Sequence, residues 1–126
     1  MKIEFLPEGS EVCPLIRLFD FDPSEAKRLV GIFTQLADGS LQSVVLTETS
    51  GFEPIAGCCL VLRVGEKNHG ILAKGIGSFE CILEKSQWEQ VVGLAEPFCS
   101  SSTRGNFQWL DETSSISLLI SPTGCW

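Results

Sequence analysis

The chain has 126 residues, of which 44% are hydrophobic and 20% are charged. This length fits one domain, and so apolar a composition excludes an intrinsically disordered chain. A net charge of −7, with nine scattered Lys and Arg residues, argues against nucleic acid or an anionic membrane as a partner. No apolar stretch approaches the roughly twenty residues of a membrane helix, and the acidic start Met1–Glu8 does not resemble a signal peptide. We therefore expect a single acidic domain, residues 1–126, in the cytoplasm.

A strand followed by a helix is predicted near the amino terminus. Residues 12–21 are rich in apolar and aromatic side chains, which is typical of a strand. The run Asp22–Glu25 then matches a capping box with proline at the first helical position. Apolar residues recur at helical spacing over 26–37, and Gly39 can adopt the left-handed conformation that ends a helix.

The middle of the chain predicts four strands, at residues 43–48, 58–64, 71–76 and 79–84. The run 58–64 is almost continuously apolar, which indicates a central strand. Residues 65–70 predict a hairpin turn that joins it to the strand 71–76. Phe79, Cys81 and Leu83 alternate with Glu80, Ile82 and Glu84, as expected for a half-buried strand.

The carboxyl-terminal third predicts a second helix and two strands. Ser86–Glu89 matches another capping box, and Pro97 marks the end of the helix. A hydroxyl-rich loop covers residues 99–106, and strands are expected at 107–110 and 116–120.

These elements predict the α+β class, in the order β-α-β-β-β-β-α-β-β. Each helix has one apolar stripe, so both helices are expected on one face of a mixed or mainly antiparallel sheet of five to seven strands. Segments 22–32 and 84–94 also share Ser24/Ser86, Val30/Val92 and Gly31/Gly93 at a constant spacing. Duplicated β-α-β units would give a ferredoxin-like variant, whereas two helices that each follow a strand also resemble one another without duplication.

The cysteines are the first candidates for chemistry. The six are Cys13, Cys58, Cys59, Cys81, Cys99 and Cys125, and no C-x-x-C spacing occurs among them. We expect reduced thiols that pack in the interior, and neither a metal nor a cofactor. Cys99 lies near a loop, and the lone His69 is its one imidazole partner, but His69 sits in a predicted turn. We therefore predict no catalytic residue, with Cys99 and His69 as the weak candidates.

The loop at 99–106 is the strongest candidate for a ligand site. Hydroxyls and a guanidinium can bind an anion, because arginine pairs with carboxylate or phosphate through two hydrogen bonds. The alternative is a polar loop without a ligand. The candidate ligand-binding residues are Ser101, Ser102, Thr103, Arg104, Asn106 and Trp109.

The sequence alone does not establish the function, and three hypotheses remain. The first is a non-catalytic interaction or accessory domain that binds a protein partner or forms a homodimer. The second is a domain that binds a small anionic ligand with the loop 99–106 and the strand 107–110. The third is a small cysteine-dependent enzyme. No catalytic motif or phosphate loop is visible, which favours the first.

Overall fold

The computed structural model describes residues 1–126 and contains two α-helices and nine strands. The helices are α1 (Pro23–Asp38) and α2 (Lys85–Ala95). The strands are β1 (Lys2–Leu6), β2 (Leu15–Phe19), β3 (Ser43–Val45), β4 (Glu53–Pro54), β5 (Cys59–Val64), β6 (Gly70–Gly75), β7 (Ser78–Leu83), β8 (Gln108–Asp111) and β9 (Ser117–Ser121). The 3-10 helices are η1 (Leu46–Glu48), η2 (Glu96–Cys99) and η3 (Ser101–Thr103).

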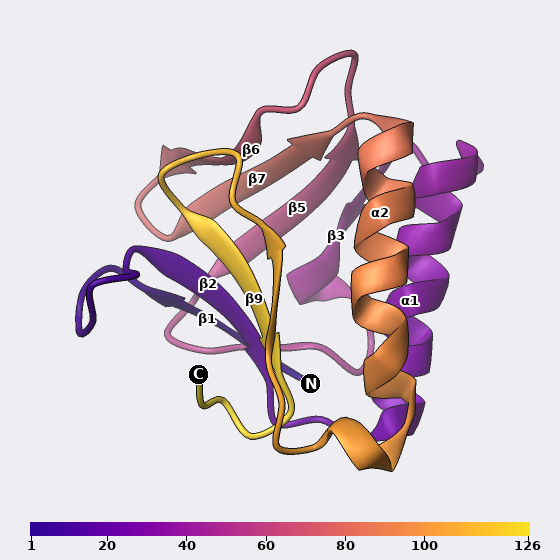
Figure 1. Ribbon diagram of the computed structural model, residues 1–126. Coiled ribbons are helices and arrows are strands. Elements are labelled where there is room, and N and C mark those ends of the chain that lie inside the picture. The colour runs from indigo at the N-terminus through magenta and orange to yellow at the C-terminus, as the bar shows by residue number, and fades with distance from the viewer.

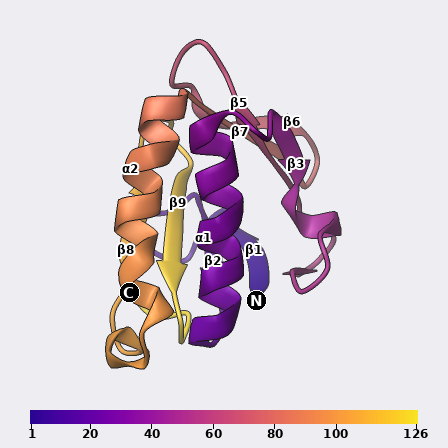
Figure 2. The same ribbon diagram turned by 90° about the vertical axis from the view of Figure 1, so that its right-hand side faces the viewer.

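The α+β class is confirmed, but the strands form two mixed sheets and not the single sheet expected. One sheet has the order β4-β1-β2-β9-β8, and the other has the order β3-β5-β7-β6. The two helices lie side by side and antiparallel along one side of both sheets (Figures 1 and 2). Sequence analysis also missed β1 and β4, which extend the first sheet beyond β2.

The core lies between the two sheets and the helix pair. A single cluster of 26 buried residues takes side chains from both sheets and both helices. The sheets meet where the rings of Phe5 on β1 and Phe79 on β7 lie 4.4 Å apart. On the helix side, Trp88 of α2 stacks on Phe33 of α1 with ring centroids 5.7 Å apart. The packing therefore joins all the layers into one domain.

The two helices begin in different ways. At α1 the predicted capping box is confirmed: the Asp22 side chain accepts from the Glu25 amide, and the Glu25 side chain accepts from the Asp22 amide. At α2 the predicted box is wrong, because the N-cap is Glu84 and its side chain makes no capping hydrogen bond. Ser86 lies inside the first turn, where its own backbone is already helical, so it cannot occupy the capping position.

The strand pairing differs from the predicted hairpin at residues 65–70. Strand β5 pairs with β7 in parallel, and β6 pairs with β7 antiparallel, so β7 lies between the two strands expected to be partners. The tight hairpin of this sheet is therefore β6–β7, closed by the glycine-flanked turn at 75–77. Strands β5 and β6 are both apolar enough to pair with each other or with β7. The pattern of side chains alone does not determine which of these pairings forms.

The two halves of the chain have equivalent topologies. Apart from the two-residue strand β4, which lies between β3 and β5, the order in the first half is β1-β2-α1-β3-β5, and in the second half it is β6-β7-α2-β8-β9. With β4 left aside, β1 and β2 lie in the larger sheet and β3 and β5 in the smaller one, whereas β6 and β7 lie in the smaller sheet and β8 and β9 in the larger one. The second strand of each half pairs in parallel with the last strand of the other half, so the pair β2–β9 corresponds to the pair β7–β5. Each repeated unit is thus β-β-α-β-β, which differs from the β-α-β unit of the ferredoxin-like alternative.

The buried faces of the helices also correspond across the two halves. Ala26, Leu29, Phe33 and Leu36 match Trp88, Val91, Ala95 and Phe98 at the same constant spacing that relates Ser24 to Ser86. At two positions the sizes are exchanged, since Ala26 corresponds to Trp88 and Phe33 to Ala95. The rings of Phe33 and Trp88 stack on each other, whereas the equivalent position in the other half is an alanine in each case. The helix interface therefore contains one stacked pair of rings and not two.

A strained turn precedes β5 and gives a stability prediction. Ala56 and Gly57 both have positive φ, +56° and +74°, and the Cys58 amide donates to the Ile55 carbonyl at 3.2 Å. A left-handed conformation costs alanine about 1 kcal/mol, whereas asparagine tolerates it. Because Ala56 is exposed, Ala56→Asn should raise the free energy of unfolding by roughly 0.5–1 kcal/mol in urea denaturation.

The control for this substitution is Ala73→Asn, which makes the same chemical change at an exposed position in a strand. Asparagine is a poor strand former, so this control should not gain stability. An equal gain at both positions would show that relief of the positive φ is not the cause.

Candidate functional site

The predicted anion loop borders a small cavity at the amino end of α1. Its volume is about 60 Å³, and Ser101 and Arg104 are the two predicted ligand residues that line it. Thr103 instead donates its hydroxyl to the carbonyls of Pro97 and Ser100, both at 2.9 Å. Ser102, Asn106 and Trp109 do not line the cavity. The structure therefore gathers only two of the six predicted residues around a concave site.

The charges of this cavity do not favour an anion. Asp22 lines the same cavity as Arg104. Its carboxylate accepts from the Glu25 amide at 2.9 Å and the Ser24 hydroxyl at 2.7 Å, and these bonds hold the pKa of Asp22 below its ordinary value. An incoming phosphate or carboxylate would face this negative charge as well as the guanidinium. The cavity is also only a few water molecules in size.

The structure separates the two weak catalytic candidates. His69 is exposed and follows Asn68, whose side chain accepts from the Glu84 amide at the amino end of α2. Cys99 lies in η2, beyond the carboxyl end of α2. The 11-residue helix between them spans roughly 16 Å, far beyond hydrogen-bond reach. Burial also raises the pKa of Cys99, so its thiol is protonated at neutral pH.

Other thiols are more deeply buried and give a pH prediction. Cys81 is fully buried, and burial raises its pKa far above the ordinary value, as it raises that of Cys58. Below about pH 8.5 the thiols are neutral in both folded and unfolded chains. Above that pH the unfolded chain ionises first, so the free energy of unfolding should fall with rising pH, by up to about 1.4 kcal/mol per pH unit for Cys81.

Urea unfolding with a reductant at pH 8, 9 and 10 measures this fall. The chain has no tyrosine, whose titration would overlap with that of the thiols. The control is Cys81→Ala, which should lessen the slope, and native-state labelling should modify the exposed Cys125 first. A stability that stays flat to pH 10, or rapid labelling of Cys81, would contradict the assignment.

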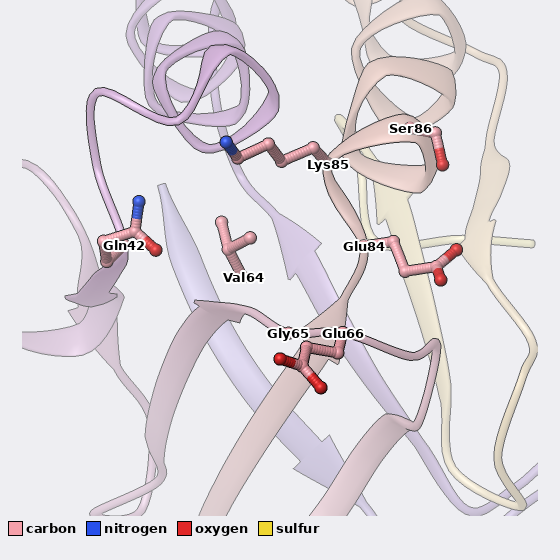
Figure 3. Close-up of a pocket in the computed structure, with 7 residues that line it drawn as sticks. All are labelled: Gln42, Val64, Gly65, Glu66, Glu84, Lys85 and Ser86. Atoms are coloured by element: carbon pink, nitrogen blue, oxygen red, sulfur yellow. The ribbon is translucent and has the colours of Figure 1, made fainter.

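A wider hollow lies where the carboxyl end of α1 meets the amino end of α2 (Figure 3). Its volume is about 530 Å³, and most of its lining is polar. The Lys85 side chain extends toward the end of α1, and Gln42 donates to the Gly39 carbonyl at 3.0 Å. The Glu66 and Glu84 carboxylates point in different directions in Figure 3. Gln42 and Lys85 therefore lie against the end of α1, and the polar groups of the hollow do not converge on one point.

A second open hollow, of about 630 Å³, follows the solvent side of the helix pair. Its lining includes the carboxylates of Asp38, Glu89 and Glu96 together with the small residues Ala37 and Gly93.

Every buried side-chain nitrogen or oxygen of the molecule has a hydrogen-bond partner, so no buried polar atom is left unpaired for a ligand. No group of three or more His, Cys, Asp or Glu side chains is placed to hold a metal ion.

The outer face of the larger sheet carries a pair of aromatic side chains. Phe107 and Trp109 meet edge to face with centroids 6.4 Å apart. The carboxyl-terminal tail turns back on the same sheet, where Arg17 donates to the Gly124 carbonyl at 2.9 Å and covers the ring of Phe19. Trp126 at the end of this tail is 39% exposed. The tail therefore docks on its own sheet through Arg17.

The smaller sheet ends in an uncovered edge strand, β6. At its start, Ser114 donates to the Ile71 carbonyl at 2.7 Å, which shows that this carbonyl points away from β7. Backbone groups two residues apart point to the same side of a strand, so those of Ala73 also point outward. Ala73, Lys74 and Gly75 are all exposed. The register with β7 shifts between Ala73 and Gly75, so the outward backbone groups that follow from this alternation are those of Ala73, and no other strand of the chain pairs with them.

The β6–β7 hairpin also carries the most exposed apolar side chain of the molecule. Ile76 is fully exposed at the turn, between Gly75 and Gly77, which both have positive φ. The turn lies on the side of the molecule away from the helices (Figure 1). The predicted strand 71–76 included Ile76, but β6 ends at Gly75 because the backbone turns there.

The other edges of the sheets are shorter or covered. Strands β3 and β4 have three and two residues, and β8 packs against α2. Strand β6 has six residues and no covering element over its second half. Sequence reasoning missed this site, although the isoleucine between two glycines is itself a signal, since turns lie at the surface of a domain.

Comparisons with known proteins assign the chain to no family. No family model, curated protein or solved structure matches the chain. No helix is long and apolar enough to cross a membrane.

Proposed function

We propose that the chain is a non-catalytic interaction domain that binds an extended segment of a partner protein along β6. The observation that carries the proposal is the uncovered edge at Ala73–Gly75, which ends at the fully exposed Ile76. A strand added to such an edge gains backbone hydrogen bonds, and side-chain contacts supply its specificity. Exposed edges also promote aggregation, and natural proteins usually cover or blunt them.

The contacts around the edge support this mode of binding. The start of β6 is fixed, because Gly70 packs against Asp111 and Thr113 and the Ile71 carbonyl is bound by Ser114. On its other side β6 is bonded to β7, with an irregularity in the register between Ala73 and Gly75. The start of the edge is therefore held in place before a strand is added, which lowers the cost of ordering it.

A peptide-display selection tests the proposal. Random nine-residue peptides are selected on the purified protein and then tested on two variants, Ala73→Pro and Ala73→Val. Proline removes the outward amide, whereas valine keeps it and favours the strand. We expect enriched peptides to bind wild type and Ala73→Val, and to lose at least about tenfold in affinity on Ala73→Pro.

The two variants must first show the same near-ultraviolet circular dichroism as wild type. Ala73 is exposed and lies at the edge, where proline is tolerated. Enriched peptides that bind Ala73→Pro as well as wild type, or a selection that enriches none, would overturn the proposal.

A further inference from the structure

The charge at the centre of the uncovered edge indicates which strand it accepts. Lys74 is the one charged residue of β6, and it is exposed. Its ammonium takes part in none of the salt bridges of the molecule, whereas Glu80, on the neighbouring strand, is paired with Arg63 at 3.0 Å. The edge therefore presents one unpaired positive charge between two neutral residues, Ala73 and Gly75.

A second copy of the chain fits this edge poorly. Two copies that add strand to strand are related by a twofold axis, and the open segment Ala73–Gly75 is centred on Lys74. The Lys74 side chains of the two copies would then lie close together across the axis, and like charges so placed are destabilising. A shift of the register toward the start of β6 would need the Ile71 carbonyl, which Ser114 already binds.

We infer that the partner strand carries an acidic residue opposite Lys74, in an otherwise uncharged extended segment; this inference rests on the function proposed above. An opposite charge across a strand pair is favourable, and the fully exposed Ile76 next to it offers an apolar contact. The net charge of −7 repels a long acidic run, so a single Asp or Glu is the chemistry that fits both the edge and the whole protein.

The test uses three libraries of nine-residue peptides. The central residue is fixed as Glu, Gln or Lys, and the other eight positions hold only uncharged residues. On wild type we expect enrichment in the order Glu, Gln, Lys, with about a threefold difference between the first and the last. On Lys74→Glu the order should reverse, while Lys74→Gln should remove the preference.

The outcomes separate this inference from the function on which it rests. Equal enrichment of all three libraries, lost on Ala73→Pro, would overturn the acidic partner and leave the edge site intact. No enrichment of any library, or enrichment unaffected by Ala73→Pro, would overturn both. Sedimentation equilibrium gives a separate check, since a wild-type dimer that Ala73→Pro dissociates would make a second copy the occupant.

Discussion

Cutting the chain between Glu66 and Lys67 should leave two fragments that are each unfolded and that fold together when mixed. The cut lies in an exposed segment between β5 and β6. Each half contributes strands to both sheets, so a single half cannot complete either of them. The pairs β2–β9 and β5–β7, which join the halves, lie in the interior of their sheets. Separation also breaks the stack of Phe33 on Trp88.

The size of the effect follows from the core. Of its 26 residues, 14 belong to the first half and 12 to the second, and each half alone exposes the surface that the other covers. Segments of about 60 residues are marginal folding units even when their core is complete. We therefore expect loss of the whole cooperative transition in each fragment, which means loss of the roughly 5–15 kcal/mol that is usual for a domain.

Tryptophan fluorescence measures the reassembly directly. All three tryptophans lie in the second fragment, so its emission should shift to shorter wavelength when the first fragment is added. The midpoint of unfolding of the complex should depend on concentration, because assembly is now bimolecular. A fragment that folds alone with native near-ultraviolet circular dichroism, or a mixture that stays unfolded, would contradict the interlocked arrangement of the halves.

The parts of this fold that the sequence predicts are those encoded by local spacing. The bounds of α1 follow from the capping box at Asp22 and from Gly39, because both signals act within one turn of the helix ends. The alternation over Phe79–Leu83 likewise predicts which side chains of β7 face the core. Each of these signals lies within a few consecutive residues, so it can be recognised without knowledge of the rest of the chain.

The parts that could not be predicted depend on distant partners. The insertion of β7 between β5 and β6 depends on a parallel pairing, and no local turn encodes that register. The division into two sheets arises because each half exchanges strands with the other. The edge site has the same origin: the outer side of β6 is open only because no other strand of the chain pairs with it there.

The substitution Trp88→Ala should be the most damaging single change in the helix interface. Trp88 is completely buried, stacks on Phe33, and donates its indole N–H to the Arg63 carbonyl at 3.1 Å. Truncation of a buried tryptophan leaves a large cavity and costs about 3–5 kcal/mol. The corresponding position in the first half holds Ala26, so no second large ring stands ready to fill the space.

Two further variants separate packing from the hydrogen bond. Trp88→Phe keeps a ring against Phe33 but loses the N–H, so it should cost roughly 1–2 kcal/mol. Trp109→Ala makes the same truncation on a half-buried side chain and should cost less than Trp88→Ala. Urea denaturation with circular dichroism measures all three. If Trp88→Ala cost no more than Trp109→Ala, the helix pair would not be held by this stack, and the interlocked halves would need another source of stability.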